Sequence, residues 1–173
     1  MKGPGPSQSP PPPAADTVTL PCFSMRDPYA SLLLHGVKTI ETRNHPMLEG
    51  VVGPCLLHVG HKTMPEDVAA EFLWRTGLVD EQSMDRMMQP PRGFQRGQVL
   101  GLVELGETRR RSEAECAQEA VQKQVTAEDV GKFHTPVLKA RWLDRPVRER
   151  GQPGVWQVTL PADMLPKDLD LKP

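Results

Sequence analysis

The sequence is poor in aromatic residues, with one Tyr, four Phe and three Trp among 173 residues. A surface that binds its ligand mainly by stacking on aromatic rings is therefore not expected. Charge of either sign is not in excess, since the net charge is −1. This balance excludes the broad basic surface of a protein that coats nucleic acid nonspecifically, so any nucleic-acid site must be a local patch.

Cysteine is scarce as well. Cys22, Cys55 and Cys116 are odd in number, far apart and never in a CxxC pair. This usage indicates a reducing compartment and excludes a disulfide framework. The spacing of Cys55, His58 and His61 suggests zinc ligands, but three such positions on a strand cannot all point one way, and no fourth ligand lies nearby. We expect no metal and no cofactor.

Long apolar runs and known catalytic motifs are also missing. No segment approaches the length of a membrane span, and no Gly-rich phosphate loop, HExxH or GxSxG motif occurs. The first residues lack the apolar core of a secretory signal, and no arginine precedes Arg26, so a mitochondrial presequence is not expected either. We expect a cytoplasmic or nuclear monomer without membrane contact.

Proline is abundant only at the start. Residues 1–16 alternate proline with Gly, Ser and Ala, and such a segment cannot bury apolar surface. We expect a disordered or polyproline tail. A solvated tail is the simpler interpretation, and a ligand for a proline-binding module is the alternative. The folded domain is expected over 17–166, followed by a C-terminal tail over 167–173.

The periodicity predicts short strands and helices in mixed order. The clearest strand is 98–107, which is apolar on both faces and should be central. Further strands are expected at 17–23, 51–59, 136–143 and 154–160. Helices are expected from the cap Asp27, over 63–75 and 112–124 from capping-box spacings, and over 79–88. The sum predicts an α+β domain or a small barrel with inserted helices.

The most informative stretch is Gly36-Val-Lys38-Thr39-Ile-Glu41-Thr-Arg43. Gly36 can end the preceding helix, and the following residues favour a strand over 37–43. Alternation along that strand gives two faces, with Thr39, Glu41 and Arg43 on one and Lys38, Ile40 and Thr42 on the other. Lys38 then either reaches the same cleft from the loop after Gly36 or points elsewhere.

These side chains suit a polar ligand. Lys38 can hold a phosphate or, once deprotonated, act as a base. Arg43 offers a planar fork for phosphate or a base edge, and Glu41 can accept from an exocyclic amine. The simpler alternative is that Glu41 and Arg43 pair on one strand face and hold one end of the barrel together.

The segment from Ser24-Met-Arg26-Asp-Pro28-Tyr29-Ala30 through the 36–43 stretch resembles the signature of ASCH domains. The stretches 58–61, 97–108 and 141–143 are similar to those of the eukaryotic branch that includes the endothelial-overexpressed, lipopolysaccharide-associated factors. The resemblance covers residues 20 to 162. It implies a PUA-like β-barrel with a cleft beside the first helix, and binding of RNA or modified nucleosides.

Some small bacterial members of that family are amidohydrolases that remove the acetyl group from N-acetylcytidine. The resemblance assigns their lysine to Lys38. Their threonine, three residues later, corresponds to Glu41, which is a departure from the pattern. Their distant glutamate has no clear counterpart, and Glu104 is one candidate for assisting Lys38.

Other candidates surround this stretch. Arg26 and Tyr29 lie in the resembling segment, and Tyr29 can reach the cleft. His58 is either a cleft donor or acceptor or a satisfied histidine at a strand end. The run Arg109–Arg111 can form a phosphate-binding rim with Arg92 and Arg96, or an exposed basic loop.

The sequence therefore leads to one main hypothesis and two alternatives. The main one is a module that binds RNA or a modified nucleoside through Arg26, Tyr29, Lys38, Thr39, Glu41, Arg43 and His58. The first alternative is an amidohydrolase with Lys38 as base, assisted by Glu41 or Glu104. The second is an adaptor that binds a protein partner through the Pro-rich tail.

Overall fold

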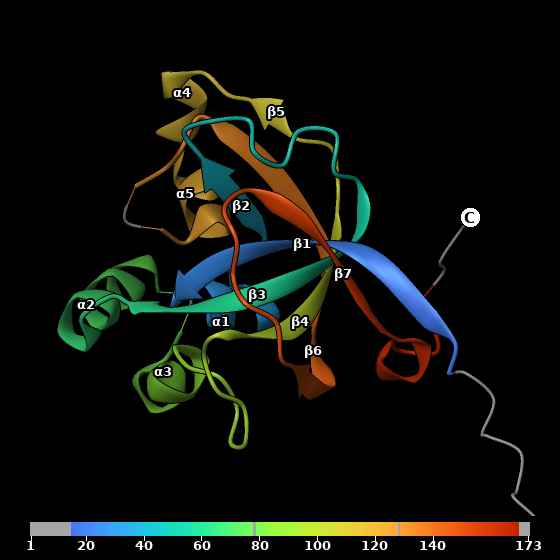
Figure 1. The fold of residues 1–173 in the computed structure, drawn as a ribbon. Helices are drawn as coiled ribbons and strands as arrows, with labels where there is room; N and C mark the ends of the chain where they lie inside the picture. Colours follow the sequence, from blue (N-terminus) through green and yellow to red (C-terminus); the bar gives the residue numbers. More distant parts are fainter. Residues whose placement is uncertain (1–14, 78, 128, 170–173) are drawn as a thin grey trace, which may run out of the picture.

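A computed structural model describes residues 15–77, 79–127 and 129–169 (Figure 1). The Pro-rich tail predicted for 1–16 lies almost wholly outside these residues, as does the end of the tail predicted for 167–173. The described chain is mixed α+β, which confirms the predicted class. None of its helices is long and apolar enough to cross a membrane.

In chain order, the strands are β1 (Thr17–Asp27), β2 (Ile40–Arg43), β3 (Gly53–Thr63), β4 (Gln98–Leu105), β5 (Arg109–Arg110), β6 (Phe133–Val147) and β7 (Val155–Pro161). The helices are α1 (Tyr29–Leu34), α2 (Glu66–Thr76), α3 (Glu81–Met87), α4 (Glu113–Cys116), α5 (Glu119–Val125) and the 3-10 helix η1 (Ala162–Met164). Figure 1 places α2 beside α3, and α4 and α5 near β2 and β5.

All strands belong to one seven-stranded sheet in the order β2-β6-β4-β3-β1-β7, with β5 paired to β6. β1 and β3 run parallel, and the other neighbours are antiparallel. The sheet is open, because β2 and β7 do not pair in the described part of the chain. The sheet nevertheless curls, since Arg43 Nη2 on the edge strand β2 donates at 3.0 Å to the Ser24 carbonyl on β1, which is the neighbour of the other edge strand, β7.

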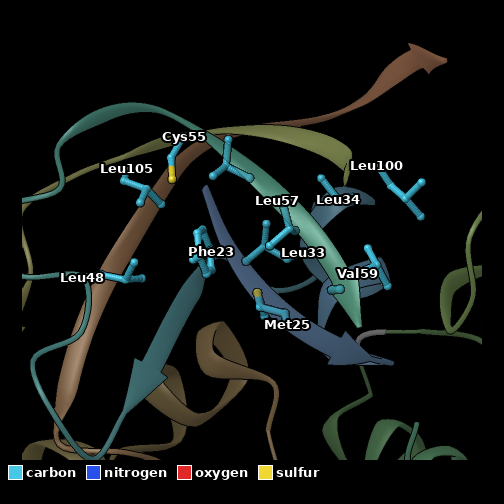
Figure 2. Packing of buried hydrophobic residues seen from close by; sticks show 12 residues of the cluster. Phe23, Met25, Leu33, Leu34, Leu48, Cys55, Leu57, Val59, Leu100 and Leu105 are labelled. Carbon is cyan, nitrogen blue, oxygen red and sulfur yellow. The ribbon is translucent and has the colours of Figure 1, made fainter. Parts of the chain in front are cut away.

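The core lies on both faces of this sheet. One cluster packs α1 against β1, β3 and β4, and Figure 2 shows Leu33 and Leu34 of α1 beside Phe23, Met25 and Leu57. The other cluster includes Leu20, Leu56 and Trp156 on the opposite face. β4 contributes to both clusters and pairs with β3 and β6, which confirms it as the central strand.

α1 begins one residue later than predicted, because its N-cap is Pro28 rather than Asp27, but both of its ends are fixed. Asp27 Oδ1 accepts from the Ser31 amide at 3.0 Å and from its hydroxyl at 2.7 Å, while Arg96 Nε pairs with Oδ2 at 2.7 Å. Gly36 has φ +80° and its amide donates to the Leu33 carbonyl. Such a left-handed glycine ends a helix without steric cost.

The strand predicted over 37–43 is shorter than expected and begins only at Ile40. The amides of Val37 and Lys38 both donate to the Leu32 carbonyl, at 2.9 and 3.1 Å. The Thr39 amide donates to the backbone carbonyl of Gln124, near the end of α5. These backbone amides already have acceptors, so residues 37–39 cannot use them to pair with a neighbouring strand as part of β2.

Two predicted helix boundaries are also wrong. β3 continues through Thr63, so α2 begins at Glu66 without the expected side-chain cap. The capping box of Ser112 and Glu115 is confirmed, but the helix predicted over 112–124 breaks into α4 and α5 where Gln118 is extended.

The close approach of α1 to β4 gives a testable prediction. A Cβ atom at Gly101 would lie 2.2 Å from Leu34 Cδ2, and Leu34 is held in the core. We expect Gly101→Ala to lower the free energy of unfolding by about 1–3 kcal/mol, measured by urea denaturation. Gly60→Ala is the control, because its Cβ would make an ordinary 3.5 Å contact with Ser24 Oγ. Equal stabilities of the two variants would contradict this packing.

Candidate functional site

A cavity of about 260 Å³ lies between β1, the start of α1 and the edge strand β2. Most of the predicted ligand-binding residues line it: Arg26, Tyr29, Lys38, Glu41 and Arg43. The rest of its wall includes Ser24, Thr42, Ala127 and Asp129. No local pattern indicated Ala127 or Asp129, because they reach the cavity from a loop far along the chain.

Lys38 is the most unusual residue of this cavity, because its side chain is only 2 % exposed. Its ammonium donates to the Val125 carbonyl at 2.5 Å and lies 3.4 Å from Glu41 Oε2. The carbonyls at a helix C-terminus lack helical partners and favour a cation. Burial lowers the pKa of Lys38 below that of an ordinary lysine, and the charge of Glu41 opposes this shift.

Lys38 reaches the cavity from the loop after Gly36, and there it meets Glu41 and Arg43 of β2. Glu41 is buried, and its Oε1 lies 2.8 Å from Arg43 Nε. The expected same-face pair of Glu41 and Arg43 is thus confirmed. Both carboxylate oxygens of Glu41 already face a cation, so the expected contact from Glu41 to a base amine would have to displace one of them.

Two cations lie near the one aromatic ring that lines the cavity. Arg26 Cζ lies 5.5 Å from the centre of the Tyr29 ring, and Lys38 Nζ lies 5.8 Å from it. Both distances suit cation–π attraction. Arg26 is exposed and makes no ion pair within the described residues, so its guanidinium remains open to a ligand.

Three predicted site residues do not line this cavity. Thr39 is exposed, and its carbonyl accepts from the Val137 amide. His58 is buried on the same face of the sheet as Trp156, and the centres of the two rings lie 5.9 Å apart. Glu104 lies on β4 in another cavity, where it faces Lys139 at 3.7 Å.

His58 is connected to the site only through Ser24. The Ser24 hydroxyl lies 2.9 Å from His58 Nδ1, while the Ser24 carbonyl accepts from Arg43. Burial lowers the pKa of His58, so the ring stays neutral behind the site. Cys55 packs in the α1 cluster on the opposite face from His58, so these residues do not form the zinc site that their spacing suggested.

The arginines expected to form a phosphate-binding rim are divided between separate cavities. Arg96 lines one cavity and is held by Asp27. Arg110 and Arg111 line a different one, and Arg111 lies 3.9 Å from Glu115. The single rim that the sequence offered as one alternative is therefore not assembled, whereas Arg109 and Arg110 are exposed, as the alternative of a basic loop predicted.

A comparison of the chain with models of known protein families finds no match.

The buried ion pair gives a second prediction. Glu41→Gln leaves the Lys38 ammonium buried without its counter-charge, so we expect the free energy of unfolding to fall by roughly 3 kcal/mol at neutral pH. The loss should shrink as the pH rises toward 10.5, the ordinary pKa of lysine. In that range the unfolded chain still binds the proton that the folded variant has released, so folding becomes more favourable as the pH rises.

The matched control is Glu119→Gln, which breaks the exposed pair of Glu119 and Lys123 at 2.8 Å. Exposed pairs contribute little, so little or no change in stability is expected. Adding Lys38→Met to Glu41→Gln should restore part of the lost stability. Chemical denaturation over a pH series measures the free energy of unfolding of all three variants. Similar losses from Glu41→Gln and Glu119→Gln would show that Lys38 does not depend on Glu41.

Proposed function

We propose that this chain is a binding module for RNA or a modified nucleoside, with one base held in the cavity between Arg26, Lys38 and Arg43. The observation that carries the proposal is the cluster of Lys38, Glu41 and Arg43 in that cavity. Buried charges are costly, and outside structural ion networks they concentrate at sites that handle polar ligands.

The cluster favours a ligand group rich in acceptors. Glu41 is occupied by two cations, whereas Lys38 and Arg43 each carry more N–H groups than their described partners use. Carbonyl oxygens and ring nitrogens of a base, or phosphate oxygens, are acceptors of this kind. The exposed guanidinium of Arg26 offers a flat surface on which a base can stack.

The size of the cavity narrows the ligand further. A volume of about 260 Å³ is below the range of roughly 300–1,000 Å³ typical of sites for drug-sized molecules. It suits a single base or nucleoside rather than a base pair. An RNA ligand must therefore present an unpaired base, as sequence-specific RNA recognition generally requires.

The proposed fold family is ASCH, with a PUA-like β-barrel. Three features support it: the short α1 directly after β1, the Gly36 stop, and the strand of Glu41 and Arg43 beside the cavity. The curl of the sheet, which brings Arg43 to the Ser24 carbonyl, is in the direction that barrel closure requires. A cytoplasmic or nuclear location and a monomeric state stay predictions, and the adaptor alternative concerns the tail outside the described residues.

The amidohydrolase is the second candidate, and a specific observation favours it. Lys38 is buried with a lowered pKa and lies 3.4 Å from Glu41, as a lysine base with an acidic partner would. The carbonyl of Val125 and the charge of Glu41 nevertheless both hold the ammonium form. Binding without turnover is therefore the better-supported function, and Glu104 has no part in this cavity.

The binding function is tested with Arg26→Ser, because Arg26 is exposed and its loss should not affect the fold. We expect the affinity for cytidine and for short unpaired RNA to fall about tenfold, which corresponds to a loss of roughly 1.4 kcal/mol on removal of a guanidinium platform. Arg145→Ser is the control, since Arg145 is an exposed arginine outside this cavity. Isothermal titration calorimetry measures both. Equal affinities of the two variants would place the ligand elsewhere.

Turnover is tested by incubating the chain with N-acetylcytidine and measuring released acetate. The binding function predicts no release above background. Release that is lost in a folded Lys38→Met variant would establish the hydrolase instead, with circular dichroism as the check on folding.

A further inference from the structure

A second, larger cavity of about 750 Å³ adjoins the first, and Asp129 lines both. Its size is ordinary for a small-molecule site. Its wall carries the cations of Arg110, Arg111 and Lys132, together with Glu113 and the thiol of Cys116. The proposed nucleoside site uses none of these groups.

Cys116 is paired with a buried histidine. Its sulfur lies 3.5 Å from Nε2 of His134, which is 1 % exposed and 2.8 Å from the Gly131 carbonyl. The carbonyl needs a donor, so the proton belongs on Nε2, and Nδ1 has no hydrogen-bond partner in the described part of the chain. Burial, and after it the nearby charges of Arg111 and Arg109, lower the pKa of His134, so the ring stays neutral. The Gly131 carbonyl already accepts this one N–H, so a thiolate at Cys116, 3.5 Å from Nε2, takes a share of the same donor.

The other cysteines cannot react in this way. Cys22 and Cys55 are fully buried, and burial raises the pKa of the Cys55 thiol to about 12 and that of Cys22 further. Cys116 is partly exposed in the wall of the cavity. Thiols that are accessible and close to cations react with disulfides, whereas buried ones are inert.

We propose that Cys116 is a modification site that forms a mixed disulfide with a small anionic peptide thiol of the glutathione class. The cations of Arg110, Arg111 and Lys132 attract the carboxylates of such a reagent. In the reaction, Cys116 gives its proton to solvent and its thiolate attacks one sulfur of the oxidised peptide disulfide. A new sulfur–sulfur bond forms, the old one breaks, and the second peptide leaves as a thiolate.

The adduct is coupled to the first cavity through Gly131. Cys116 Sγ lies 3.7 Å from the Gly131 carbonyl, and the Gly131 amide donates to Thr42 Oγ1 at 3.2 Å. Gly131 also packs so tightly on β2 that a Cβ there would lie 2.6 Å from the Arg43 carbonyl. A group added at Cys116 therefore displaces Gly131 against Thr42 and Arg43. The expected weakening of nucleoside binding rests on the proposed function, whereas formation of the adduct does not.

The adduct is tested on the folded full chain with oxidised glutathione at neutral pH, using intact-mass and peptide mass spectrometry. We expect one glutathionyl group, on Cys116, which dithiothreitol removes and Cys116→Ser prevents. Arg110→Ser should slow the reaction with oxidised glutathione about tenfold. It should leave the rate with neutral bis(2-hydroxyethyl) disulfide unchanged. His134→Leu should slow both reagents, and His134→Gln, which keeps a donor, should retain the reaction.

No adduct on the folded chain, or adducts on Cys22 and Cys55 at a similar rate, would overturn the modification site. Equal slowing of both disulfides by Arg110→Ser would overturn the role of the cations. If the adduct forms and the unmodified chain binds cytidine, unchanged affinity after modification would overturn the coupling through Gly131. If the unmodified chain does not bind cytidine, the proposed function fails while the modification site stands.

Discussion

The ammonium group of Lys38 is held almost entirely away from water, and its partners connect three parts of the chain. Val125 supplies a carbonyl from the end of α5, and Glu41 supplies a carboxylate from the edge strand β2. Glu41 also pairs with Arg43, whose guanidinium donates to the Ser24 carbonyl on β1. A buried cation without partners is costly, so these contacts constrain where α5 and β2 lie and bring the edge strand β2 to β1 across the open sheet.

The same contacts give the cavity its chemical character. Because Glu41 is neutralised by two cations, what the wall offers to a ligand is mainly the remaining N–H groups of Lys38 and Arg43. Arg26, outside the network, is free to meet a planar ligand. An adjoining cavity on the far side of Asp129 holds Cys116, and Gly131 lies between the two. The proposed nucleoside site and the proposed modification site are thus neighbours, with the tightly packed Gly131 between them.

Local patterns predicted those features that depend on neighbouring residues. The two apolar faces of 98–107 identified the central strand, and the spacing of Glu41 and Arg43 placed both on one strand face. The helix stop at Gly36 follows from its lack of a Cβ atom. The α+β class follows from the mixed order of these elements.

Features set by distant parts of the chain could not be predicted. The acceptor for Lys38 is Val125, 87 residues away, and no spacing rule indicates it. β2 begins later than predicted because the carbonyls of Leu32 and Gln124 accept hydrogen bonds from the backbone amides of the residues just before it. Alternation predicts that His58 and Cys55 face opposite ways, but not that His58 points to Trp156 rather than to the site.

The most direct test of the central claim is a crystal structure of the chain soaked with cytidine. The account predicts density for the base in the cavity of about 260 Å³, with its acceptor atoms within hydrogen-bond distance of Lys38 or Arg43 and its ring against Arg26. Density for cytidine in the larger cavity beside Cys116, or an unoccupied site at a concentration that saturates binding in solution, would contradict it.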